Sequence, residues 1–135
     1  GRHYEVVAAQ GIARAATIVC GDALDPPLVP GVFDRVVALN LLDSVASPGQ
    51  LLSVVDALVR PGGEIILACP YQWVTEERIG GADPAADLVA ILRDGAGLRA
   101  AYTVLDEAEL DWGLRRDSRA RLEYRIHYLW ARKGS

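Results

Sequence analysis

The sequence contains no methionine, two cysteines, two histidines and one phenylalanine in 135 residues. Neither cysteine stands in a Cys-x-x-Cys or His-rich pattern, so we expect no metal site and no dithiol redox centre. Cys20 and Cys69 follow short apolar runs, and we expect both to be buried, inert thiols at strand ends. The absence of methionine and the start at Gly-Arg-His-Tyr indicate a processed chain or one part of a longer protein.

Long apolar runs and an excess of positive charge are also missing. No run approaches the roughly 18 residues that a membrane span needs, and the first residues do not show a charged segment followed by an apolar core and a small-residue cleavage site. The 14 basic and 18 acidic residues give a net charge of −4, which attracts neither phosphate backbones nor anionic lipid. We therefore expect a cytoplasmic protein of one domain, residues 1–135, that binds neither nucleic acid nor membranes.

Apolar runs alternate with helical spacing through the middle of the chain. Residues 17–20, 33–39 and 64–69 are rich in Val, Ile and Leu and predict buried strands. Residues 47–59 predict a helix, because Ser, Pro and Gln stand where a capping box requires them. Strand, helix and strand with short connections favour a right-handed crossover in a mostly parallel sheet with helices on both faces.

The second half of the chain predicts one more helix and a hairpin. Asp83 and Gly95 have the chemistry of a helix cap and a helix stop. Residues 101–105 and 122–132 predict strands, and the aromatic alternation in the second of these favours antiparallel pairing. Residues 3–15 show a weak helical pattern.

Polar residues follow two of the expected strands, where open α/β sheets bind ligands. Asp22 either contacts a ligand or caps the following turn. Asn40 and Asp43 either contact a ligand or form a polar turn. Tyr71 and Trp73 either stack on a planar substrate or belong to the core or a lid.

Two other candidates favour structural interpretations. His127 has no recognisable partner in the sequence, so we assign it no catalytic role. The arginine-rich segment 115–121 also contains an aspartate, and a solvated loop is favoured over an anion site. We name no catalytic residue.

The order of these elements resembles a known family. Gly21-Asp22-Ala23, the run at residues 33–42, and Leu-Val-Arg-Pro-Gly-Gly before the strand at 64–69 resemble the middle and C-terminal part of class I S-adenosylmethionine-dependent methyltransferases. The resemblance covers roughly residues 17–131. It implies a truncated Rossmann-like α/β fold with a C-terminal antiparallel hairpin.

The resemblance also implies positions for the cofactor and the methyl acceptor. Asp22 would accept a hydrogen bond from the adenine amino group, and the backbone N–H of Ala23 would meet the ring. Asn40, Leu41 and Leu42 would border the methionine part of S-adenosylmethionine. The residues that would line a pocket for a small acceptor molecule are Asp43, Tyr71 and Trp73.

Half of the family's cofactor site has no counterpart here. The glycine-rich loop and the acidic residue that holds the ribose should precede residue 17, but residues 1–16 contain no Gly-x-Gly. We therefore expect cofactor binding only where the missing half is supplied, and an inactive isolated chain. The alternative is a degenerate module without cofactor that serves dimerisation or scaffolding. The orphaned edge at residues 17–20 predicts a homodimer or pairing with a missing N-terminal segment.

Overall fold

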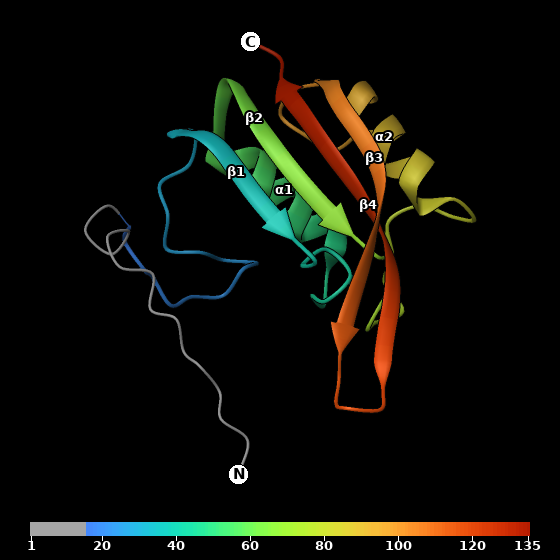
Figure 1. The fold of residues 1–135 in the computed structure, drawn as a ribbon. Coiled ribbons are helices and arrows are strands. Elements are labelled where there is room, and N and C mark those ends of the chain that lie inside the picture. The colour runs from blue at the N-terminus through green and yellow to red at the C-terminus, as the bar shows by residue number, and fades with distance from the viewer. Residues whose placement is uncertain (1–15) are drawn as a thin grey trace.

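The computed structural model describes residues 16–135, so the helix expected at residues 3–15 lies outside the described residues (Figure 1). Four strands form one sheet in the order β1-β2-β4-β3, and two helices accompany them. The elements in chain order are β1 (Phe33–Leu39), α1 (Pro48–Leu58), β2 (Val59–Cys69), α2 (Pro84–Asp94), β3 (Tyr102–Arg115) and β4 (Arg121–Lys133).

The fold is the expected α/β type, but the sheet is mostly antiparallel. Only β1 and β2 run parallel, and α1 connects them. β4 pairs antiparallel with both β2 and β3. The prediction of a mostly parallel sheet was wrong because the described chain holds a single strand-helix-strand crossover, whereas the C-terminal hairpin contributes two of the three strand pairings.

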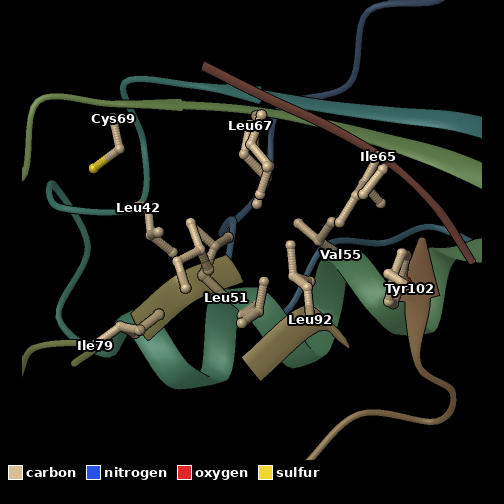
Figure 2. Packing of buried hydrophobic residues seen from close by; sticks show 14 of the residues in the cluster. Leu42, Leu51, Val55, Ile65, Leu67, Cys69, Ile79, Leu92 and Tyr102 are labelled. Carbon is tan, nitrogen blue, oxygen red and sulfur yellow. The ribbon is translucent and has the colours of Figure 1, made fainter. Parts of the chain in front are cut away.

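Both described helices cover the same face of the sheet, whereas the sequence predicted helices on both faces (Figure 1). Leu51 and Val55 of α1 and Leu92 of α2 share one core with alternate residues of β2, as Figure 2 shows. We call the opposite surface of the sheet the open face.

None of the helices in residues 16–135 is long and apolar enough to cross a membrane.

The helix starts follow the sequence signals, but only one of them is capped as expected. In α2, the Asp83 side chain accepts a hydrogen bond from the Ala86 N–H, and Gly95 ends the helix at φ 68°. α1 begins at Pro48, yet Ser47 forms no side-chain cap. The Ser47 hydroxyl instead donates to Glu77 Oε1 at 2.7 Å, so a loop distant in sequence replaces the expected capping box.

Residues 17–20 do not form the strand that their apolar composition predicts. A short strand is stable only when a neighbour satisfies its backbone, and β1 pairs on one side alone within the described sheet. As a result Cys20 is exposed, against the prediction, while Cys69 is buried as expected. Burial raises the pKa of the Cys69 thiol to about 12, which keeps it protonated and unreactive.

The strands extend further than the sequence indicates. β2 begins at Val59, so the Pro-Gly-Gly segment belongs to the strand and does not separate it from α1. A Cβ at Gly63 would lie 2.9 Å from the Asp34 carbonyl oxygen, so the close approach of β1 requires glycine there. β3 and β4 continue past the end of β2 as a long two-stranded arm (Figure 1).

A buried ion pair joins α1 to the end of β4. Lys133 Nζ lies 2.8 Å from Asp56 Oδ1, and both side chains are almost fully buried. Asp56 also accepts hydrogen bonds from the Tyr102 hydroxyl and the Arg99 N–H, each at 2.7 Å. Burial alone would raise the pKa of Asp56, but Lys133 and the other two donors lower it. The sequence analysis did not identify this cluster.

Replacing Asp56 by Asn should lower the free energy of unfolding by about 3–5 kcal/mol, because it leaves the Lys133 ammonium buried without its counter-charge. Urea denaturation measures the change. The exposed Asp34, which accepts from Arg60 at 2.7 Å, provides the matched control. Asp34→Asn should cost less than about 1 kcal/mol. Equal losses for the two variants would contradict the prediction.

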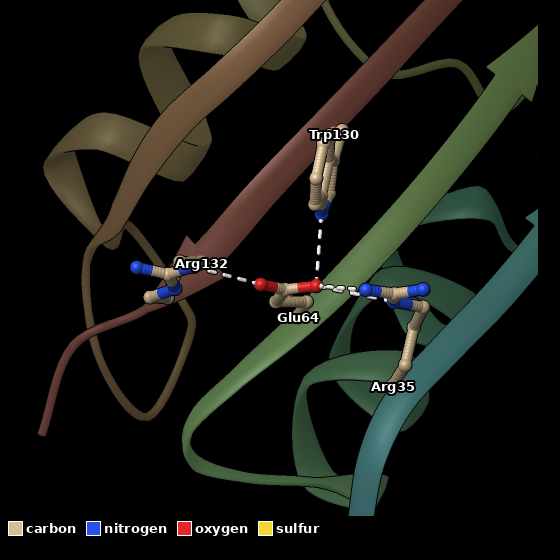
Figure 3. Close-up of polar contacts among 4 residues, drawn as sticks. All are labelled: Arg35, Glu64, Trp130 and Arg132. Atoms are coloured by element: carbon tan, nitrogen blue, oxygen red, sulfur yellow. Dashed lines mark hydrogen bonds and ion pairs between the residues drawn. The ribbon is translucent and has the colours of Figure 1, made fainter.

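A second charge cluster lies on the open face, where Glu64 of β2 sits between two arginines (Figure 3). Its carboxylate accepts from Arg35 at 2.6 Å, from Arg132 at 2.9 Å and from the Trp130 indole N–H at 3.1 Å. Hydrogen bonds from Arg132 and Arg35 lower the pKa of Glu64 from 4.5 to about 2. The cluster connects β1, β2 and β4 at one end of the sheet.

The contribution of Glu64 to stability should therefore depend on pH. A depressed pKa gives stability that is complete above pH 4.5 and is lost as the pH falls toward about 2. The difference in unfolding free energy between the wild type and Glu64→Gln should be constant near neutrality and shrink through this window. Denaturation at several pH values measures it, with Glu123→Gln, an exposed partner of Arg121, as control. A difference that is unchanged at pH 3 would refute the assignment.

Candidate functional site

The candidate site lies where the parallel strands β1 and β2 end side by side. Leu39 pairs with Ala68 at this edge, and the ladder continues through a 2.7 Å hydrogen bond from the Asn40 N–H to the Ala68 carbonyl. Each strand leads into a non-glycine residue with positive φ, Asn40 at 52° and Tyr71 at 56°. Ligands of open α/β sheets bind beyond such carboxyl ends.

Asp22 lies in a turn that α1 holds in place. Asp22 Oδ1 accepts from the Leu24 N–H at 2.9 Å, and the Asp25 N–H donates to the Asp22 carbonyl at 3.2 Å. Gln50 in the first turn of α1 donates to the Leu24 carbonyl at 3.1 Å. Asp22 thus caps the turn, which was one of its two interpretations, while the exposed carboxylate keeps a second oxygen for a ligand.

Residues 40–42 differ in what they can offer a ligand. Asn40 is exposed and its strained backbone turns the chain away from β1. Leu41 is half-buried and packs against the core. Leu42 is only 2% exposed and belongs to the core itself (Figure 2). Asn40 is therefore the residue of this run whose side chain is available to a bound molecule.

Asp43 holds the two loops of the site together. Its side chain is 3% exposed, and Oδ2 accepts from the Gln72 N–H at 2.7 Å. Its carbonyl oxygen accepts from the Val74 N–H at 3.0 Å. The carboxylate is therefore a positioning group that fixes the loop after β2 against the loop after β1.

Tyr71 is one end of a polar chain that runs from the loop after β2 through β4 to β3. Its hydroxyl lies 2.6 Å from His127 Nδ1, and His127 Nε2 lies 3.1 Å from Glu107 Oε1. Burial raises the pKa of Tyr71, so the hydroxyl stays protonated and donates to Nδ1. His127 then carries its proton on Nε2 and donates to Glu107. The sequence alone showed no partner for His127, whereas the structure provides two, Tyr71 and Glu107.

Trp73 lies beside this chain, with its ring tilted by 41° to the ring of Tyr71 and the two centroids 5.8 Å apart. Both rings are half-buried and pack against the core, as the structural interpretation of these aromatics predicted. Ala23 and Leu24 also pack against this core. Within residues 16–135, no group of three or more His, Cys, Asp and Glu side chains could hold a metal ion.

This chain is similar in sequence and in fold to proteins of known structure. A family model described as a methyltransferase domain matches residues 3–67. An S-adenosylmethionine-dependent methyltransferase from Methanosarcina mazei superposes with a TM-score of 0.57 at 13% identity, over 84% of this chain and 65% of that protein. The chain carries part of a class I methyltransferase fold.

Other solved structures share this methyltransferase fold. A Thermotoga maritima methyltransferase, described as a possible histamine N-methyltransferase, superposes with a TM-score of 0.52 at 12% identity, over 90% of this chain and 66% of that one. The cyclase SpnF superposes with a TM-score of 0.52 at 17% identity, over 86% and 55%. The chain spans less than two thirds of the length of the Methanosarcina mazei protein.

The described residues of this chain include groups that would suit one end of S-adenosylmethionine. An exposed carboxylate at Asp22, beside the half-buried Ala23, suits an adenine amino group. No glycine-rich loop is found among residues 16–32, which precede β1.

The sequence analysis did not identify the contact between His127 of β4 and Glu107 of β3. Glu107 reaches His127 only because β3 pairs with β4, and this pairing continues beyond a register shift between Val104 and Asp106. The alternation in β4 does place His127 on the same side as Leu129, which is a signal that the histidine faces the core.

Replacing Tyr71 by Phe should lower the free energy of unfolding by about 1–3 kcal/mol, because the buried His127 Nδ1 loses its donor. The control is Tyr128→Phe, since the Tyr128 hydroxyl forms no hydrogen bond within the described part of the chain and should change stability little. Urea denaturation separates the two variants. A Tyr71→Phe protein as stable as the wild type would contradict the role given to this hydroxyl.

Proposed function

We propose that this chain supplies the adenine and acceptor sides of a methyltransferase that transfers a methyl group from S-adenosylmethionine to a small molecule. The observation that carries the proposal is the strained pair Asn40 and Tyr71 at the adjoining ends of β1 and β2. A non-glycine residue in this backbone region costs roughly 1–3 kcal/mol, and such strain concentrates at ligand sites. Asp43 maintains both bends through its buried hydrogen bond.

The roles of the residues follow from their contacts. Asp22 would accept from the adenine amino group with the oxygen that does not cap the turn, and Asn40 would hold polar atoms of the cofactor's amino-acid part. The sulfonium of S-adenosylmethionine supplies an activated methyl group. Tyr71 cannot act as a base, because burial raises its pKa and its proton is donated to His127. Rate enhancement would then come mainly from alignment of the two reactants.

The acceptor is proposed to be small and the protein cytoplasmic. A chain with net charge −4 offers little attraction to a polyphosphate backbone, which favours a small molecule over nucleic acid. Tyr71 and Trp73 would form one wall of the acceptor pocket. Cys20 and Cys69 are both free thiols, which fits a reducing compartment.

A second candidate is a module that binds no cofactor and serves dimerisation or scaffolding. The observation that favours it is that the sequence of residues 1–16 contains no Gly-x-Gly, the pattern that lets the backbone approach a bound cofactor closely. Cofactor binding therefore discriminates between the two candidates.

Calorimetric titration of the 135-residue chain with S-adenosylhomocysteine tests the proposal. Binding in the micromolar range is expected, and Asp22→Asn should weaken it about 10–100-fold, the equivalent of one charge-assisted hydrogen bond. Asn keeps one acceptor oxygen for the Leu24 N–H, so the turn persists while the second acceptor is lost.

Asp25→Asn is the matched control, because Asp25 is an exposed acid in the same turn. It should leave the affinity unchanged. Absence of measurable heat for the wild type would reject the enzyme proposal for this chain and favour the module without cofactor. Equal weakening by both substitutions would reject the specific role of Asp22.

A further inference from the structure

The tip of the arm formed by β3 and β4 holds a pocket lined by arginines. The pocket has a volume of about 450 Å³ and is formed by the end of β3, the turn and the first residue of β4. Its charged lining consists of Arg115, Asp117, Arg119 and Arg121. Three guanidinium groups against one carboxylate give the pocket an excess of two positive charges, although the whole chain carries a net charge of −4.

Two of these arginines face each other across the strand pair. Arg115 and Arg121 are partners in the antiparallel register of β3 and β4. Side chains of directly paired residues project from the same face of a sheet with their Cβ atoms about 5 Å apart, and like charges in such positions destabilise the pairing. An anion bound between the two guanidinium groups would remove this repulsion.

The chain makes room for one of the two guanidinium groups. Arg121 lies over Gly113, where an added Cβ would be 2.7 Å from the Arg121 Cζ atom. The absence of a side chain at Gly113 therefore lets the guanidinium lie close to the backbone of β3. Arg121 also forms an ion pair with Glu123, which orients its side chain before a ligand binds.

Asp117 shapes the turn and forms no ion pair with the arginines. Its Oδ1 accepts from the N–H groups of Arg119 at 2.7 Å and Ala120 at 2.9 Å. Arg115 Nε donates to the backbone carbonyl oxygen of Asp117 at 3.2 Å, a contact that fixes the side chain without cancelling its charge. Within residues 16–135, neither Arg115 nor Arg119 belongs to an ion pair. The loop is exposed, as the sequence predicted, but its guanidinium groups keep donors for a ligand.

We propose that the tip of the arm binds the phosphate monoester group of a small molecule. Such a group carries close to two negative charges near neutral pH, which matches the excess charge of the pocket. Its three terminal oxygens can accept from two guanidinium forks at once, whereas a carboxylate offers only two oxygens. Arg115 and Arg121 would bind it from the two strands, and Arg119 from the turn. A nucleic-acid backbone matches less well, because each phosphodiester carries a single charge.

This phosphate site is separate from the candidate site at the ends of β1 and β2. The arm projects beyond the edge at which those two strands end (Figure 1). Arg121 lies six positions before His127, the residue of β4 that pairs with the last residue of β2, and six residues of extended strand span about 20 Å. One small molecule does not fill both sites, so this inference depends neither on methyl transfer nor on cofactor binding.

Calorimetric titration of the 135-residue chain with inorganic phosphate tests the proposal. A dissociation constant of about 1 mM or lower is expected. Arg115→Gln and Arg121→Gln should each raise it at least about 10-fold, because each substitution removes charge-assisted hydrogen bonds to the anion. Both side chains are exposed, so the fold should persist, and circular dichroism verifies it.

Arg125→Gln is the matched control. It removes the same charge from the same face of β4, but Arg125 lies outside the pocket and pairs in register with Asp111. At about 0.1 M salt, exposed charges more than about 10 Å apart are largely screened, so this substitution should leave the dissociation constant unchanged. A wild type that binds no phosphate, or equal weakening by Arg115→Gln and Arg125→Gln, would overturn the proposal.

A single-stranded RNA oligonucleotide distinguishes a small phosphate monoester from a phosphodiester backbone. At the same salt concentration it should bind no more tightly than inorganic phosphate. Tighter binding of the oligonucleotide that Arg115→Gln abolishes would overturn the assignment to a small molecule and would identify the tip as a contact for nucleic acid.

Discussion

The buried contact between Lys133 and Asp56 decides how β4 lies in the sheet. Side chains of a strand alternate between two faces, so the burial of Lys133 beside Asp56 also assigns Ala131, Leu129 and His127 to the helix side. A slip of one residue would leave Asp56 as an unpaired buried charge and would move the whole set to the other face. The polar chain through Tyr71 and the aromatic open face both depend on this register.

Local signals in the sequence predicted local structure well. The run at residues 33–39 became β1 with the same bounds, and Asp83 and Gly95 bound α2 through the cap and the left-handed stop that their chemistry predicts. Ser47 shows the limit of this reasoning. Its position next to Pro48 predicted the start of α1, but its hydroxyl binds Glu77, a partner that only the tertiary structure brings near.

The features that sequence could not predict depend on long-range pairing. Residues 17–20 have strand composition, but strand formation needs a neighbour, and none of the described strands pairs with them. In the candidate site, the positions after β1 and β2 were predictable from the strand ends, whereas the function of Asp43 as a link between loops was not. The contact between Glu107 and His127 could not be predicted, because a register shift in β3 determines which residue of β3 meets His127.

The buried carboxylate of Asp43 has a consequence for the energetics of recognition. Because it binds the backbone of the loop after β2 while belonging to the loop after β1, both loops lose their conformational freedom when the chain folds. A molecule that enters between Asn40 and Tyr71 meets walls that are already ordered. The loops lose their conformational entropy when the chain folds and not when the ligand binds. More of the free energy of each contact with the ligand therefore contributes to affinity.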